Sequence, residues 1–157
     1  MEEEPIKRRE MRELRERIER GSDESRPEAL TRRRHKGFRS ARENLADLID
    51  AGSFVEYGQL AVAAQRRRRD YTELQTQTPG DGVITGIARI NGTYFPDSMA
   101  RVAGIIYDYS VLAGTQGFFN HAKIDRLLEV ARRQRLPVIM YTEGGGGRPG
   151  DTDVSTQ

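Results

Sequence analysis

The sequence contains no cysteine, which excludes disulfide bonds, thiolate zinc sites and a cysteine nucleophile. It has only two histidines, His35 and His121, so a histidine-rich metal site is not expected. No apolar run approaches the roughly 20 residues that cross a bilayer. The first ten residues are highly charged and no apolar segment follows them, unlike a signal peptide. These absences predict a soluble, cytoplasmic protein without membrane contact.

A strong charge of one sign is also missing. The chain has 26 basic and 24 acidic residues and a net charge of +2, which argues against a protein that coats DNA. Its 157 residues suffice for one domain of ordinary size. Apolar residues make up only 36% and charged residues 32%. Since apolar residues and glycine become more frequent after Pro79, we expect the folded centre there and helical arms before it.

The N-terminal half predicts helices. Residues 6–20 are rich in helix formers and carry a narrow apolar stripe, while Pro27 suits the first turn of a second helix. Ser40 and Glu43 form a capping box for a third helix that ends before Gly52, and residues 53–57 predict a short strand. We divide the chain into a charged N-terminal helix (1–25), a helical segment (26–57), an Arg-rich mobile linker (58–78) and a folded domain (79–157).

The C-terminal half predicts an α/β fold. Residues 83–90 are typical of a strand, and Asn91-Gly92 predicts a type I′ hairpin whose return strand begins at residue 93. Residues 101–109 predict a buried strand, a helix follows Gly117 to about residue 135, and residues 138–141 predict a second buried strand. The sum is a βαβ unit with parallel strands, preceded by N-terminal helices.

Glycine-rich turns follow both strands of this unit, at Gly114 and at residues 144–147. Ligands of such sheets bind beyond the carboxyl ends of the strands, so we expect the two turns to lie side by side. The second turn allows three interpretations. A nucleotide-binding G-x-G-x-x-G is weakened by Pro149 inside it. The others are a plain flexible loop and a set of backbone N–H groups that binds an oxyanion.

Several motifs, in order, resemble one known family. Residues 37–43 (GFRSARE) resemble its G-K-x-T-A-R-E, and residues 48–56 (LIDAGSFVE) resemble L-x-D-x-G-S-F-x-E. Residues 81–86 (DGVITG) are similar to D-G-V-V-T-G, and residues 108–115 (DYSVLAGT) to D-F-T-V-x-G-G-S. Residues 137–148 resemble P-V-I followed by D-S-G-G-A-R. Together they resemble the N-terminal portion of the carboxyltransferase β-subunits of biotin-dependent acetyl-, propionyl- and methylcrotonyl-CoA carboxylases.

The resemblance implies a partial crotonase-like (ClpP/crotonase) fold and transfer of a carboxyl group from carboxybiotin to an acyl-CoA. It implies that the N–H groups of Gly145 and Gly146 bind the thioester oxygen and that Gly114 and Thr115 line the acyl-CoA site. Arg39 and Arg42, within a basic cluster, are candidates for the coenzyme A phosphates. Biotin would be carried on a partner domain or subunit. The remaining carboxyltransferase half or further copies would complete the enzyme, so we expect this chain alone to be inactive.

This sequence departs from the family pattern at several positions. Phe38 replaces a lysine, Ala113 replaces a glycine, and Glu143, Gly144 and Gly147 replace Asp, Ser and Ala. We interpret these departures as a divergent branch, serving longer acyl chains or a fused multidomain carboxylase. The alternative is a non-catalytic Arg-rich module that binds a carboxylase partner or RNA, although nucleic acid is not favoured. The acyl length, the oligomeric state and the choice between a truncated product, a split subunit and a pseudo-enzyme stay open.

Overall fold

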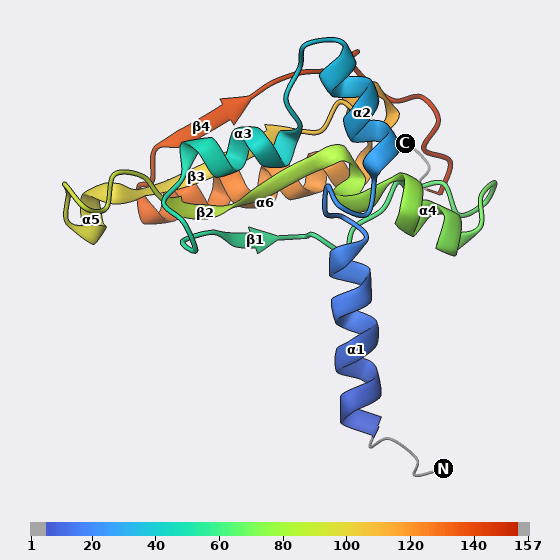
Figure 1. Ribbon diagram of the computed structural model, residues 1–157, viewed down its shortest axis with the longest axis horizontal. Helices are drawn as coiled ribbons and strands as arrows, with labels where there is room; N and C mark the ends of the chain where they lie inside the picture. Colours follow the sequence, from blue (N-terminus) through green and yellow to red (C-terminus); the bar gives the residue numbers. More distant parts are fainter. Residues whose placement is uncertain (1–5, 154–157) are drawn as a thin grey trace.

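The computed structural model describes residues 6–153. Its helices are α1 (Ile6–Glu19), α2 (Pro27–His35), α3 (Ala41–Leu48), α4 (Tyr71–Gln77), α5 (Asp97–Ala100) and α6 (Phe118–Gln134), with short 3-10 turns η1 (Pro79–Gly82) and η2 (Leu112–Gly114). Its strands are β1 (Val55–Tyr57), β2 (Val83–Arg89), β3 (Arg101–Tyr107) and β4 (Val138–Tyr141). They form one sheet in the order β1-β2-β3-β4, with β1 and β4 at its edges (Figure 1).

The sheet lies between two helical layers (Figure 1). Side chains alternate between the two faces of β2 and β3, so each strand supplies both cores. On one face α6 buries Ile124, Leu127 and Ala131 against a cluster that includes Val83 and Ile105. On the other face α3 packs against Ile84 and Ile106; its Ala41 and Leu45 belong to that second cluster. β3 is therefore buried along nearly its whole length, as expected.

The βαβ unit of β3, α6 and β4 has the predicted parallel pairing, with Ala103 opposite Val138. The strand at residues 138–141 is less buried than expected, however. Val138, Met140 and Tyr141 are all exposed, because β4 is an edge strand of the sheet that the described residues form. An apolar run predicts a strand but does not reveal what covers it.

The hairpin between β2 and β3 is antiparallel, but its return strand begins at Arg101 and not at residue 93. A type I′ turn needs positive φ at both central residues, and only Asn91 (φ 58°) has it. The N–H of Gly92 instead donates to Asp50 Oδ2 at 2.8 Å. The chain then inserts α5 before it returns, and the N–H of Ile90 donates to the carbonyl of Ala100 at 2.9 Å.

Residues 58–78 differ from the expected mobile linker. They contain α4, which begins where the Asp70 side chain accepts hydrogen bonds from the N–H groups of Thr72 and Glu73. Val62, Ala63 and Leu74 form a third small core with the partly buried Leu112. The sequence does not reveal this small core for two reasons. Its apolar residues are too few to produce a periodic pattern, and four consecutive arginines at residues 66–69 separate them.

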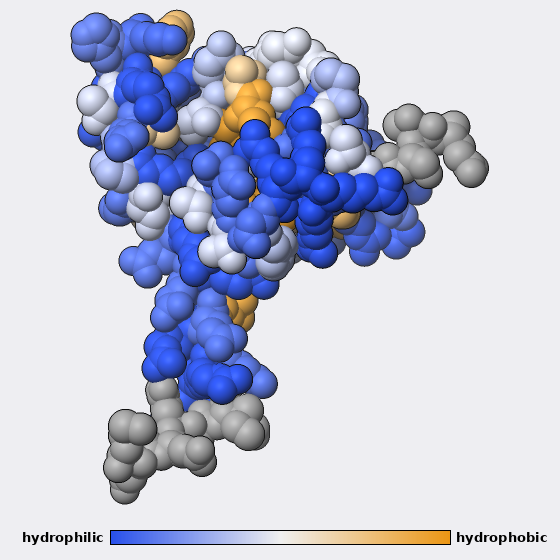
Figure 2. All heavy atoms as spheres, turned by 90° about the vertical axis from the view of Figure 1, so that its right-hand side faces the viewer, coloured by the Kyte–Doolittle hydropathy of each residue, from blue (hydrophilic) through white to orange (hydrophobic). Residues whose placement is uncertain are grey.

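Helix α1 projects away from the rest of the molecule (Figure 1). Its C-terminal end is joined to α4, where Arg17 donates to the Tyr71 hydroxyl at 2.8 Å and Arg20 donates to Gln75. Figure 2 shows that α1 and the face of the molecule above it are covered mainly by hydrophilic residues. Within the part of the chain that the structure describes, no helix has both the length and the apolar character to span a membrane.

Candidate functional site

The two glycine turns meet at one end of the sheet. We call residues 112–115 the Gly114 turn and residues 144–147 the glycine loop. Gly114 has φ 63°, and a Cβ added to it would lie 2.1 Å from the carbonyl oxygen of Glu143. A Cβ on Gly144 would lie 2.2 Å from the carbonyl oxygen of Gly114. Only glycine at both positions allows this approach, and the predicted juxtaposition of the turns is confirmed.

Backbone hydrogen bonds extend the parallel pairing of β3 and β4 into this region. The N–H of Gly145 donates to the carbonyl of Ala113 at 3.2 Å, and the N–H of Gln116 donates to that of Gly146 at 2.8 Å. The N–H of Arg148 donates to the carbonyl of Gln116 at 2.8 Å. The glycine loop is therefore held in a defined path and is not a plain flexible loop.

These bonds decide which amides are available to a ligand. The N–H of Gly145, one of the two predicted oxyanion donors, is occupied by Ala113. The N–H groups of Gly114 and Thr115 are also occupied, by the carbonyls of Val111 and Leu112. Within residues 6–153, the amide of Gly146 has no acceptor, and its φ of 95° is one that glycine adopts readily.

A buried ion pair between Arg148 and Asp81 connects the segments around the two turns. Arg148 donates to Asp81, and their side chains are only 5% and 0% exposed. Arg148 also donates to the carbonyl of Thr115 at 2.7 Å, and the N–H of Asn120 donates to Asp81 Oδ2 at 2.7 Å. The network thus ties η1, the Gly114 turn, α6 and the segment after the glycine loop together. Opposite charges so deeply buried persist only when paired.

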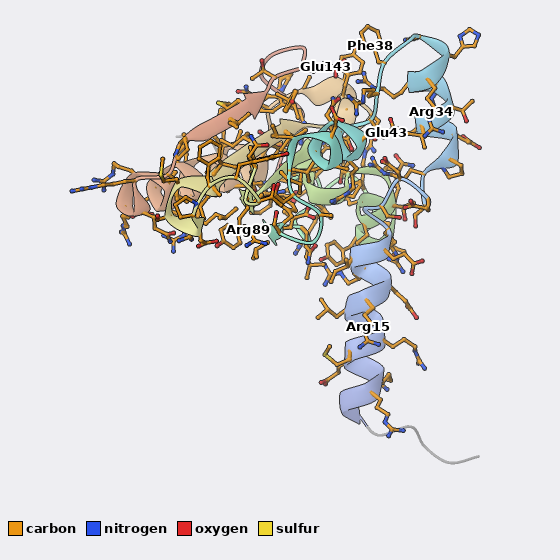
Figure 3. All side chains as sticks on the ribbon, turned by 60° about the vertical axis from the view of Figure 1, so that its left-hand side comes forward. Arg15, Arg34, Phe38, Glu43, Arg89 and Glu143 are labelled. Atoms are coloured by element: carbon orange, nitrogen blue, oxygen red, sulfur yellow. The ribbon has the colours of Figure 1, made fainter. Side chains whose placement is uncertain are left out.

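A cavity of about 450 Å³ lies beside the turns, between α2 and the end of β3. Its walls combine cationic and apolar side chains: Ala29, Arg32, Arg33, Lys36, Phe38, Tyr109, Ser110, Ala113 and Glu143. Phe38 and Glu143 are labelled in Figure 3, where both lie near α2. Such a mixed wall suits a ligand that has anionic groups and an apolar part.

Arg33 lines this cavity and pairs with Glu143, the residue before the glycine loop. It donates to both carboxylate oxygens of Glu143, at 2.6 and 2.7 Å, and its side chain is 11% exposed. The hydrogen bond to Glu143 raises the pKa of Arg33 above its ordinary value. The guanidinium also lies 5.2 Å from the ring centre of Phe38 and 5.5 Å from that of Tyr109.

The two predicted phosphate-binding arginines do not line this cavity. Arg39 pairs with Asp47 at 3.0 Å, and Arg42 pairs with Glu56 at 2.9 Å and donates to the carbonyl of Gly21 at 3.0 Å. Other arginines of the basic cluster are also paired within the chain, as Arg34 is with Glu43 (Figure 3).

Asp108 holds the turn that follows β3 through hydrogen bonds. Its carboxylate accepts hydrogen bonds from the N–H and hydroxyl of Ser110, at 3.0 and 2.5 Å, and from Arg26 at 2.8 Å. His121 lies exposed on α6. The pairs of Asp81 with Arg148 and of Arg33 with Glu143 were not predicted. Their partners lie 67 and 110 positions apart, and the only signals were single charged residues beside turns.

Comparison with known proteins identifies the family. Residues 32–154 match the Carboxyl transferase domain. The chain is 35% identical over 144 residues to the biotin-dependent long chain acyl-coenzyme A carboxylase beta4 subunit of Mycobacterium tuberculosis, covering 91% of this chain and 24% of that protein. It is 31% identical over 120 residues to the propionyl-CoA carboxylase beta chain of Saccharopolyspora erythraea, covering 76% of this chain and 20% of that one.

A solved structure of a single-chain, multi-domain long-chain acyl-CoA carboxylase superposes with a TM-score of 0.88 at 51% identity, over 93% of this chain and 15% of that one. Transcarboxylase 12S, at 23% identity and a TM-score of 0.71 over 96% of this chain and 27% of that one, shares the fold. The predicted partial crotonase-like α/β fold is confirmed. The chain spans about a quarter or less of these relatives, and it belongs to the Carboxyl transferase domain family.

Proposed function

We propose that this chain forms the acyl-CoA side of an acyl-CoA carboxyltransferase, which transfers a carboxyl group from carboxybiotin to the α-carbon of an acyl thioester. The observation that carries the proposal is the meeting of the Gly114 turn and the glycine loop beside a cation-lined cavity. The names of the relatives at 35% and 51% identity favour a long-chain acyl-CoA as the substrate.

The cavity suggests how coenzyme A is held. Arg32 and Lys36 are exposed at its wall, and the pair of Arg32 with Glu28, at 3.7 Å, is itself largely exposed. Both cations can therefore turn to the phosphates of coenzyme A, whereas Arg39 and Arg42 do not line the cavity. Ala29, Phe38 and Ala113 offer apolar contacts to the pantetheine arm or acyl chain. We assign the phosphate contact to Arg32 and Lys36 in place of the two arginines first expected.

The amide of Gly146 is the favoured oxyanion donor. It has no acceptor among the described residues and lies on the exposed side of the glycine loop. A preorganised N–H aimed at the thioester oxygen stabilises the negative charge that develops as the α-carbon loses its proton, by about 3 kcal/mol per donor. Gly145 acts differently, because its N–H fixes the loop to Ala113. Gly114 and Thr115 shape the site from the facing turn.

Carboxybiotin, carried by a partner domain, is the second substrate and supplies the carboxyl group. The glycine loop is exposed along its outer side, which leaves it open to such a carrier. The residues described here would hold and orient the acyl-CoA while the remaining carboxyltransferase half, or further copies, completes the site. For this reason the chain alone is expected to show no carboxylation of an acyl-CoA when carboxybiotin is supplied.

Calorimetric titration of the purified chain with the non-hydrolysable thioether analogue of palmitoyl-CoA tests the proposal. We expect saturable binding that Lys36→Ala weakens by about tenfold, roughly 1.4 kcal/mol, through loss of a phosphate contact. Arg34→Ala is the matched control, because Arg34 faces Glu43 and does not line the cavity. Absence of binding, together with RNA binding that falls steeply with salt, would instead support the Arg-rich assembly module.

A further inference from the structure

The guanidinium of Arg33 contacts four residues: Glu143, Arg39, Phe38 and Tyr109. Besides its two hydrogen bonds to Glu143, its guanidinium donates twice to the carbonyl of Arg39, at 2.8 and 3.2 Å. Phe38 and Tyr109 face it with their rings. Hydrogen bonds and rings together fix the guanidinium fork in one orientation, and a planar fork transmits that orientation to a carboxylate.

Glu143 is fixed at both of its ends. Its carboxylate is held by Arg33 from α2, and its carbonyl oxygen is pressed against Gly114, where a Cβ would lie only 2.1 Å away. The glycine loop begins at the next residue. Glycines have wide conformational freedom, so the direction of the loop depends on the residue that precedes it and on its two backbone bonds to the facing chain, from Gly145 to Ala113 and from Gln116 to Gly146.

We propose that Arg33 is a positioning residue: it orients Glu143 and thereby directs the free amide of Gly146 toward the acyl thioester. The catalytic meaning of this role rests on the proposed function. α2 contains no fully buried residue, so polar contacts such as this one contribute to its attachment to the body. A purely structural role, attachment of α2, is therefore the alternative that an experiment must separate.

Glycine-selective ¹⁵N labelling reads the position of the loop directly. In Arg33→Gln and Glu143→Gln we expect the amide resonances of Gly144 and Gly146 to shift, and hydrogen exchange of the Gly145 amide to accelerate by about tenfold as its bond to Ala113 opens. Arg34→Gln is the matched control on the same helix and is expected to leave these resonances in place. Unchanged glycine resonances in Arg33→Gln, or equal shifts in Arg34→Gln, overturn the proposal.

Arg33→Lys separates positioning from attachment. A lysine keeps the charge that attaches α2 but lacks the two-pronged fork. We expect Arg33→Lys to have the melting temperature of the unsubstituted chain but the shifted glycine resonances of Arg33→Gln. If both the melting temperature and the glycine resonances match the unsubstituted chain, the positioning role is contradicted. Binding of the palmitoyl-CoA thioether analogue is measured in parallel, with about tenfold weaker binding expected in Arg33→Gln. If the unsubstituted chain does not bind it while the resonances shift as expected, the proposed function fails and the positioning role stands.

Discussion

Lys123 of α6 is a half-buried cation whose bound acceptors are backbone carbonyls. Its Nζ donates to the carbonyl oxygens of Gly80 at 2.7 Å and Val83 at 2.5 Å. Its stem packs so closely on Gly58 that a Cβ there would lie 2.9 Å away. Removal from water lowers the pKa of this ammonium to about 8. A neutral amine still has two N–H donors, so it keeps both bonds.

This lowered pKa predicts a pH dependence of stability. Between pH 8 and 10.5 the unfolded chain holds a proton on Lys123 that the folded chain has released, so the free energy of unfolding rises with pH across that window. The rise is about 3 kcal/mol for this group, and it is lost progressively as the pH falls from 10.5 to 8. Urea unfolding at several pH values should show it in the unsubstituted chain and not in Lys123→Met.

The exposed Lys36→Met serves as the control and should keep the rise. An identical pH profile in Lys123→Met and the unsubstituted chain would mean that another group titrates in this window.

Elements that depend on neighbouring residues could be predicted from the sequence, and those that depend on distant ones could not. The capping box of Ser40 and Glu43 predicts α3 because both partners lie within one turn. The exposure of β4, in contrast, depends on what pairs with its outer edge. The sequence also could not show that the amide of Gly145 is occupied, because its acceptor Ala113 belongs to the turn that follows another strand. Family motifs located the glycine loop, but a backbone bond to the facing turn decided that the amide of Gly145 is occupied.

Helix α3 offers a test of such local control. The Ser40 hydroxyl accepts from the N–H of Glu43 at 2.9 Å, and Glu43 Oε2 accepts from the N–H of Ser40 at 2.7 Å. Ser40→Ala leaves the N–H of Glu43 without this acceptor and should lower the free energy of unfolding by about 1 kcal/mol. Urea denaturation followed by circular dichroism measures the change. Ser98→Ala, at an exposed position of α5, should have no effect; an equal loss in both would contradict the capping role.

At the scale of the molecule, the sheet is covered on both faces but not at both edges. α6 and α3 bury the central strands, so Ile105 and Ile106 are fully buried on opposite faces. The edge at β4 has no strand beside it among residues 6–153 and exposes Val138 and Met140 by 39% and 45%. The layout thus places an apolar edge and the glycine loop on the same side of the fold, since β4 leads directly into the loop (Figure 1).

An exposed apolar edge strand has unpaired backbone N–H and C=O groups, which can pair with a strand of another chain. We therefore expect the purified chain to self-associate as its concentration rises, which sedimentation velocity would detect as an increase in the weight-average sedimentation coefficient. Met140→Lys places a charge on β4 and should shift this association to higher concentration by about tenfold, roughly 1.4 kcal/mol. Met99→Lys introduces the same charge at an exposed methionine of α5, away from the edge, and should not. Equal suppression by both variants would trace the association to net charge and not to the β4 edge.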